Sequence, residues 1–243
     1  MEFKQIDAIV GELHGIASRW GQRVYEHVLE SRPQEVLELG FWHGKSSCYI
    51  AAALHELGHG HLTTVDLEAA KGNKPNIEET LLKSGLASFV TVKHEPTSYT
   101  WFLKKEIEEN TTDGKTIPKY DLAFIDGAHS WEVDGMAFFL VDKLLKNGGR
   151  ILFDDYDWSF GTSEALKSTS AVLSMPADER DSPQVKLIFE LLVKQHPSYG
   201  QFLVEQGNWA WATKLSSQEA SGVRTETRVL SPKEVVKRIL GRS

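Results

Sequence analysis

The stretch EVLELGFWHGKSS, residues 35–47, decides the fold of this chain. Its first five residues, EVLEL, have the length and the apolar content of a strand, and SSCYIAAALHEL, which begins at residue 46, has the composition of a buried helix. Gly40 and Gly44 lie in the turn between the two. Ligands of open α/β sheets bind beyond the carboxyl ends of the strands, where glycine lets a ligand approach the backbone. The stretch therefore predicts an α/β protein with a ligand site at this turn.

Short apolar runs and helical patterns alternate along the rest of the chain. The predicted strands after the first are residues 61–67, 89–94, 120–127 and 150–155, and the predicted helices are one that starts at Pro75, one at 99–109 and one at 130–146 that Asn147-Gly148-Gly149 stops. Strands separated by helices imply right-handed βαβ crossovers. A helix near residues 184–195 precedes QFLVEQ-GN-WAWATKL, which predicts an antiparallel hairpin. We therefore expect a doubly wound, seven-stranded, mostly parallel sheet that ends in this hairpin.

The chain divides into three predicted parts. Residues 1–32 carry apolar positions at helical spacing and are expected to form N-terminal helices that serve as a lid or a dimer contact. Residues 33–216 form the α/β domain. Residues 217–243 are polar and are expected to form a partly loose tail with a short helix near 233–240. A homodimer or a higher homo-oligomer stays open.

Composition excludes several classes of protein. The 243 residues suit one large α/β domain, and the net charge of -7 argues against a protein that coats nucleic acid, which needs a basic face. The single cysteine, Cys48, allows no intramolecular disulfide and fits a reducing compartment. No apolar run reaches the roughly 20 residues that span a bilayer, and the first residues lack a signal-peptide pattern. We expect a cytoplasmic protein with neither a membrane nor a nucleic-acid partner.

Two cofactor hypotheses compete for the glycine turn. Gly40-x-x-x-Gly44-Lys45-Ser46 is similar to the phosphate-binding loop of NTPases, but that loop has four residues between its glycines and this one has three. Asp66 ends the second strand, where a carboxylate can accept both hydroxyls of a ribose. Glu38 adds a negative charge that disfavours a pyrophosphate and suits S-adenosylmethionine, which carries a sulfonium and an ammonium. A metal-dependent NTPase and a non-catalytic cofactor-binding protein are the alternatives.

Three carboxylates and a histidine follow two strands that are expected to be neighbours. Asp126 ends the strand FID, and Asp154 and Asp155 end the strand ILFDD. Carboxylates that converge repel one another unless a cation lies among them, and oxygen ligands suit Mg²⁺, with Mn²⁺ or Ca²⁺ as alternatives. His129 is placed to remove the proton of a metal-bound hydroxyl. Taken one at a time, each of these residues is more often a turn or helix-capping residue.

The sequence also contains a literal match to a second metal-binding motif, which we do not expect to be functional. His55-Glu56-Leu57-Gly58-His59 matches the HExxH pattern of zinc proteases. That chemistry needs both histidines on one face of a helix, and Gly58 indicates that the helix ends before His59. We expect these residues to have no catalytic role.

The motifs together resemble the class I methyltransferases. ELGFWHGKS, VDL, FIDGAHSWE, LKNGGRILFDDY and the closing hairpin are similar to the metal-dependent group that contains the catechol, caffeoyl-CoA and macrolide-sugar O-methyltransferases, over about residues 35–215. Asp154 follows Asp126 by 28 residues and His129 follows it by three, as in the catechol enzyme's pattern. That enzyme has lysine where His129 stands and asparagine where Asp155 stands. The macrolide-sugar enzymes resemble the chain more closely at both positions.

The resemblance implies an S-adenosylmethionine-dependent O-methyltransferase that acts on a hydroxyl of a small molecule, with a sugar-containing acceptor favoured. It implies a methyltransferase domain at residues 33–216, a divalent metal held by Asp126, Asp154 and Asp155, and His129 as the base. Thr97 and Ser98 would lie near the adenine. The full set of cofactor-binding residues that it implies is Glu38, Gly40, Gly44, Ser46, Asp66, Thr97, Ser98 and Asp126. Some relatives with the DGxH pattern use no metal.

Overall fold

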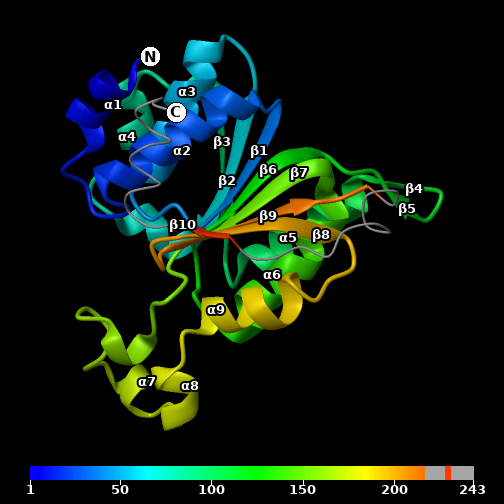
Figure 1. Cartoon of the computed structure of the whole chain (residues 1–243). Helices are drawn as coiled ribbons and strands as arrows, with labels where there is room; N and C mark the ends of the chain where they lie inside the picture. The colour runs from blue at the N-terminus through cyan, green and yellow to red at the C-terminus, as the bar shows by residue number, and fades with distance from the viewer. Residues whose placement is uncertain (217–227, 231–243) are drawn as a thin grey trace. The chain divides into compact units, whose positions relative to one another are not determined.

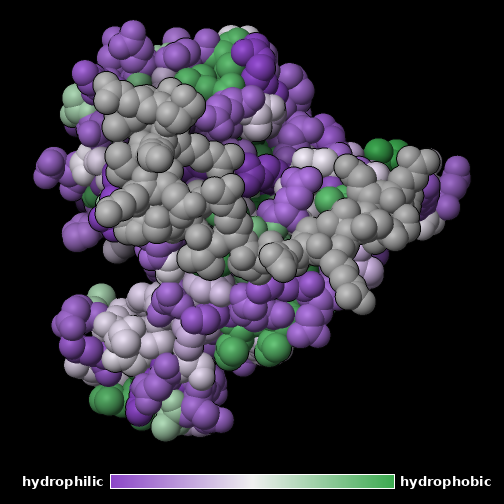
Figure 2. Space-filling model, viewed as in Figure 1, coloured by the Kyte–Doolittle hydropathy of each residue, from purple (hydrophilic) through white to green (hydrophobic). Residues whose placement is uncertain are grey.

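The computed structural model describes residues 1–216 and 228–230. The chain forms two compact units, one of Met1–Gly127 with Lys143–Lys146 and one of Ala128–Asp142 with Asn147–Ser243. The strand order is β10-β8-β9-β7-β6-β1-β2-β3, with a separate two-stranded sheet of β4 and β5. Among the described residues, no helix is long and apolar enough to cross a membrane. Figure 2 shows a mainly hydrophilic surface on the face in view, with small separate hydrophobic patches.

The first unit contains a parallel sheet with helices on both of its faces. Its elements are α1 (Phe3–Val10), α2 (Ser18–Ser31), β1 (Glu35–Leu39), α3 (Lys45–Leu57), β2 (His61–Leu67), η1 (Glu68–Gly72), α4 (Ile77–Ser84), η2 (Ala87–Phe89), β3 (Val90–Glu95), α5 (Tyr99–Glu109), β4 (Thr111–Thr112), β5 (Lys115–Thr116) and β6 (Tyr120–Ile125). Strand β1 pairs in parallel with both β2 and β6, and β2 pairs in parallel with β3. Figure 1 shows α1 to α4 together on one side of these strands and α5 on the other.

The apolar residues of β1 form the centre of this unit. Val36, Leu37 and Leu39 are fully buried, as expected for a strand that has a neighbour on each edge and a helix layer on each face. Helix α3 is buried along almost its whole length because α1 and α2 cover its outer side. It ends at Gly58, whose φ of 71° is the left-handed conformation that glycine adopts without strain.

The second unit contains the hairpin that the sequence predicts. Its elements are α6 (Trp131–Leu144) and β7 (Leu145–Phe153), except for Lys143–Lys146 where these two meet, together with η3 (Phe160–Thr162), α7 (Ser170–Leu173), α8 (Ala177–Asp181), α9 (Gln184–Ile188), the π-helical turn η4 (Phe189–Val193), β8 (Tyr199–Glu205), β9 (Trp209–Lys214) and β10 (Arg228–Leu230). Strand β9 runs antiparallel to both β7 and β8. Helix α6 packs closely on α9 and η4 at Gly135, where a side-chain carbon would lie 3.3 Å from Leu192 of η4 and 3.8 Å from Ile188 of α9.

The predicted doubly wound fold is confirmed, and all seven predicted strands are present. Strand β10 adds an eighth, parallel to β8, within the segment that was expected to be a loose tail. The hairpin of β4 and β5 was also not predicted; its turn is Asp113-Gly114, and both residues have positive φ. The predicted short helix at 233–240 lies outside the described residues. The division at residues 32 and 216 stays a prediction.

Two predicted boundaries are wrong. Helix α6 ends at Leu144, before the Asn-Gly-Gly sequence, and β7 starts at Leu145 and runs through it. The reason is that the carbonyl of Leu144 accepts a 2.7 Å bond from the N–H of Lys119, so strand-like pairing has already begun there. Helix α4 starts at Ile77 and not at Pro75, because the Asn76 side chain accepts a 2.9 Å bond from the N–H of Glu79 and caps the helix.

Candidate functional site

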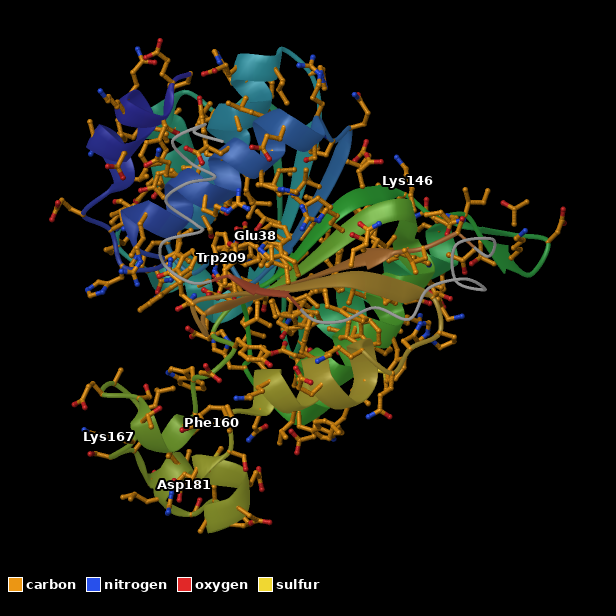
Figure 3. The ribbon with its side chains drawn as sticks, viewed as in Figure 1. Glu38, Lys146, Phe160, Lys167, Asp181 and Trp209 are labelled. Carbon is orange, nitrogen blue, oxygen red and sulfur yellow. The ribbon has the colours of Figure 1, made fainter. Side chains whose placement is uncertain are left out.

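Glu38 lies in the interior of the first unit, at the end of β1 (Figure 3). Its side chain is fully buried, and its Oε2 accepts hydrogen bonds from the hydroxyls of Ser47 and, at 2.5 Å, Thr64. Its Oε1 is buried without a hydrogen-bond partner. Burial raises the pKa of Glu38 to about 7, although the Ser47, Thr64 and Ser46 hydroxyls oppose the shift. Glu38 therefore holds the start of α3 to β1 and β2, and it keeps one unsatisfied acceptor.

Both glycines of the turn have a left-handed backbone. Gly40 has a φ of 94°, and a side-chain carbon there would lie 2.0 Å from the carbonyl oxygen of Asp126. Gly44 has a φ of 81° at the N-cap of α3. The close contact between the turn and the end of β6 therefore leaves no room for a side chain at residue 40. This packing role exists in addition to any contact with a ligand.

Asp66 holds the turn in place. Its Oδ2 accepts bonds from the backbone N–H groups of Phe41 and Trp42, at 3.0 and 2.8 Å, and its Oδ1 accepts one from Leu67 at 2.7 Å. Each carboxylate oxygen can accept more than one bond, so acceptor capacity for a ribose hydroxyl is left. Asp66 is half-exposed at the carboxyl end of β2. The structure therefore places a carboxylate beside the glycine turn, as the cofactor hypothesis requires.

Lys45 does not occupy the position of a phosphate-binding lysine. Its Nζ donates to the carbonyl oxygens of Gly11 at 2.7 Å and Leu13 at 3.0 Å, and the residue is 5% exposed. An ammonium held this way is directed to the segment between α1 and α2. Ser46, the next residue of the motif, is buried as well. Both observations argue against the NTPase alternative.

Thr97 and Ser98 lie between β3 and α5. Ser98 is the N-cap of α5, and its Oγ accepts bonds from the N–H of Thr100 at 3.1 Å and from the Thr100 hydroxyl at 2.9 Å. Thr97 is exposed. The predicted role of these two residues near an adenine stays a prediction.

Asp126 follows β6 and belongs to the first unit. Its N–H donates a 2.8 Å bond to the carbonyl of Leu39, which extends the pairing of β1 with β6 by one residue. Its side chain is half-buried. Asp126 therefore stands at the carboxyl end of a central strand, next to Gly40 of the turn.

His129 and Asp155 meet within the second unit. His129 Nε2 lies 3.7 Å from Asp155 Oδ2, and the two side chains are 19% and 33% exposed. Both residues have left-handed backbones, with φ of 52° and 57°, which is uncommon for residues other than glycine and frequent at functional sites. The ring of Trp158 packs on the imidazole with a centroid distance of 5.2 Å. His129, the predicted base, therefore lies beside a carboxylate and packs against an aromatic ring.

Asp154 is buried, and sequence reasoning missed the residue that holds it. Its Oδ1 accepts a 2.6 Å bond from the side-chain amide of Asn208 and a 2.8 Å bond from the N–H of Asp155. Burial and the charge of Asp155 raise the pKa of Asp154 above its usual range. Asn208 lies in the turn between β8 and β9, 54 residues away in sequence. The Gly-Asn pair signalled a hairpin turn, but no local pattern indicated its partner.

The predicted metal ligands do not form a complete cluster in the parts of the chain that the structure describes. Over residues 1–216 and 228–230, no three histidine, cysteine, aspartate or glutamate side chains gather as a metal-binding group. Asp154 and Asp155 are nevertheless adjacent carboxylates whose repulsion a hard cation would relieve. Their oxygen chemistry fits such an ion, and the three-ligand set stays a prediction.

The residues of the HExxH sequence contact different parts of the chain. His55 Nδ1 lies 2.7 Å from the Met1 amine, and Glu56 accepts a 2.5 Å bond from the hydroxyl of Tyr25. His59 lies beyond the end of α3 and contacts Gln34 at 3.0 Å. The two histidines thus have separate partners.

Residues 37–156 match the model of a family described as a methyltransferase domain. The chain carries a methyltransferase domain. The match starts in β1, ends just after β7 and includes Glu38, Asp66, Asp126, His129 and the Asp154-Asp155 pair. It therefore covers both the glycine turn and the predicted reaction centre.

Solved methyltransferases share the fold over nearly their whole length. TomG, an O-methyltransferase from Streptomyces achromogenes solved with S-adenosylmethionine, is 16% identical with a TM-score of 0.59, covering 89% of this chain and 92% of its own. The Bacillus cereus O-methyltransferase solved with S-adenosylhomocysteine is 17% identical with a TM-score of 0.59 over 88% and 92%. The Podospora anserina methyltransferase PaMTH1, also bound to S-adenosylhomocysteine, is 14% identical with a TM-score of 0.61 over 88% and 87%. No curated protein matches the sequence.

These comparisons confirm the predicted class of enzyme and its fold, and they do not favour the NTPase alternative. At these identities, the similarity to solved structures establishes the fold alone. The matched residues include the glycine turn, the carboxylates and the histidine.

Proposed function

We propose that this enzyme transfers the methyl group of S-adenosylmethionine to a hydroxyl of a small molecule. The observation that carries the proposal is the methyltransferase domain over residues 37–156, with Asp66 beside the glycine turn and His129 beside Asp155. The solved O-methyltransferases with the same fold, two of them holding S-adenosylhomocysteine or S-adenosylmethionine, support the choice of cofactor and of an oxygen acceptor.

The residues of the turn fit such a cofactor by their chemistry. Asp66 offers a half-buried carboxylate for ribose hydroxyls and places a negative charge beside the turn. When bound, S-adenosylmethionine supplies an electrophilic methyl group on a sulfonium. A negative environment stabilises that cation more than it stabilises a polyphosphate. We assign Gly40, Gly44, Ser46, Thr97, Ser98 and Asp126 to the same site as proposals from the family resemblance.

His129 acts as the general base in this proposal. Its Nε2 takes the proton of the acceptor hydroxyl while that oxygen forms a bond to the methyl carbon, and the carbon–sulfur bond breaks to leave S-adenosylhomocysteine. Asp155, 3.7 Å from Nε2, stabilises the imidazolium that results. The acceptor proton therefore ends on His129.

The proposal also includes a divalent metal ion that assists the methyl transfer. We retain Asp126, Asp154 and Asp155 as the ligands of a divalent cation, Mg²⁺ or alternatively Mn²⁺ or Ca²⁺, because two adjacent carboxylates with a raised pKa at Asp154 favour a positive neighbour. Such an ion would lower the pKa of the acceptor hydroxyl. A sugar-containing acceptor, favoured over a catechol, rests on the family resemblance at His129 and Asp155. A cytoplasmic location rests on the single cysteine and stays a prediction.

The proposal is tested by titrating the protein with S-adenosylhomocysteine in a calorimeter and by following methyl transfer from labelled S-adenosylmethionine to catechol and to a methyl glycoside. His129→Ala should lower the rate by about 100-fold, which is the low end of general-base catalysis, and leave the S-adenosylhomocysteine Kd within twofold. An unchanged rate would remove His129 as the base. If S-adenosylhomocysteine fails to bind and ATP raises the melting temperature, the NTPase alternative is correct.

Metal assistance is tested separately. EDTA should abolish turnover, Mg²⁺ should restore it, and the S-adenosylhomocysteine Kd should stay within twofold, since the cofactor and the ion are proposed to use largely different residues. Full activity in EDTA would contradict the metal part and leave the methyl transfer intact. Binding of S-adenosylhomocysteine without turnover on any acceptor would instead favour a non-catalytic cofactor-binding protein.

A further inference from the structure

Lys45 is a buried lysine at the first position of α3. Its Nζ donates to the carbonyls of Gly11 and Leu13 at 2.7 and 3.0 Å. A buried ammonium is costly unless it is hydrogen-bonded, so these bonds fix the backbone of residues 11–13 to α3. The backbone of Gly15 also packs on the Lys45 stem, where a side-chain carbon would lie 3.5 Å from Lys45 Cβ.

Tyr49, one helical turn later, fixes the two helices on either side of that segment. Its hydroxyl donates a 2.5 Å bond to Asp7 of α1 and lies 3.5 Å from the Ser18 hydroxyl at the start of α2. Gly21 of α2 packs against the Tyr49 ring so closely that a side-chain carbon would lie 2.2 Å from it. One face of α3 therefore holds α1, α2 and the connection between them.

His14 lies in the segment between α1 and α2 and contacts the glycine turn. Its ring stacks on Trp42, with a centroid distance of 5.6 Å and an interplanar angle of 29°. Trp42 has a φ of 47° and is 52% exposed. A residue other than glycine keeps such a backbone only when its surroundings determine it. Those surroundings include the bond from its N–H to Asp66, the 2.8 Å bond from the Asn73 amide to its carbonyl, and the rings of His14 and His43.

We propose that Lys45 is a positioning residue, which holds residues 11–15 so that His14 keeps Trp42 and the glycine turn in the conformation that binds the cofactor. The inference rests on the proposed S-adenosylmethionine site. In this arrangement the ammonium of Lys45 donates to the backbone carbonyls of Gly11 and Leu13. Its effect on the cofactor passes through His14 and Trp42.

The experiment uses the full chain and S-adenosylhomocysteine as the probe. Lys45→Met keeps the length and apolar stem of the side chain and removes both bonds. It should weaken S-adenosylhomocysteine at least fivefold and speed hydrogen exchange of the amides of residues 11–17. Lys83→Met, at an exposed lysine of α4, is the matched control and should change neither quantity. If the wild type does not bind S-adenosylhomocysteine, the proposed function fails; if it binds and Lys45→Met binds equally well, the positioning role fails.

A double-mutant cycle separates positioning from a general loss of structure. His14→Ala removes the ring and leaves the buried lysine in place, so it should weaken S-adenosylhomocysteine about as much as Lys45→Met does. If Lys45 acts through His14, the double variant should bind no more than twofold more weakly than Lys45→Met alone. Multiplied effects of the two substitutions would overturn the proposal, and so would full affinity in His14→Ala.

Discussion

Stability should depend on pH through Glu38. Its folded-state pKa is about 7 because it is fully buried, and its ordinary value is 4.5. Between these values the folded protein binds a proton that the unfolded chain has released, so the free energy of unfolding falls as the pH rises through this window. At about 1.36 kcal/mol for each pH unit, the whole shift amounts to about 3 kcal/mol, of which about 2.5 kcal/mol lies between pH 5 and pH 8.

Glu38→Gln removes this ionisation and keeps the shape of the side chain. The Ser47 and Thr64 hydroxyls, which donate to the carboxylate, can rotate to accept from an amide. Relative to wild type, the variant should gain about 2.5 kcal/mol of stability on going from pH 5 to pH 8, whatever its absolute stability is. Urea unfolding of both proteins at the two pH values measures this double difference. Glu109→Gln, an exposed carboxylate of α5, is the control and should show none. A double difference below about 0.5 kcal/mol, or one of opposite sign, would refute a buried, proton-binding Glu38.

Two further substitutions test how each unit is built. Gly40→Ala should destabilise the protein by about 3 kcal/mol or more in urea unfolding, because the new carbon would lie 2.0 Å from a backbone carbonyl at a φ of 94°; Gly114→Ala, which also has positive φ but no atom within 4 Å, should cost much less. Asn208→Ala should cost about 2 kcal/mol by the same assay, since it removes a bond to a buried carboxylate, and an effect no larger than that of Gln206→Asn in the same turn would contradict the role assigned to Asn208.

The order of strands and helices could be predicted because it depends on local sequence patterns. The alternation of apolar runs with helical segments gave the sheet, and the Gly-Asn pair gave the hairpin of β8 and β9. The boundary at Leu144 could not be predicted, because it depends on a bond from Lys119, which is distant in sequence. Local signals such as Asn-Gly-Gly indicate where a helix can end, and long-range pairing determines where it does end.

The residues of the candidate site also fall into those that could be predicted from the sequence and those that could not. Gly40 and Asp66 could be placed from sequence because strand ends and a turn position them, and the two residues lie at the same turn in the structure. The partners of Glu38 and Asp154 could not, since Thr64 and Asn208 reach them across the fold. A carboxylate at a strand end can be recognised in a sequence as a candidate site residue. The neutral donors that fix its orientation cannot, because they look like ordinary turn and strand residues.

Lys45 shows why the charge of the turn had to be read from the structure. A lysine that follows a glycine at the start of a helix can face a phosphate, and the helix N-terminus would reinforce its positive charge. Here the ammonium is bonded to the carbonyls of Gly11 and Leu13 and is removed from the surface of the turn. Asp66 meanwhile stays half-exposed beside the turn, and Glu38 lies beneath it. The accessible charge at the turn is therefore that of a carboxylate. Such a turn disfavours a polyphosphate and stabilises a ligand that carries a sulfonium and an ammonium.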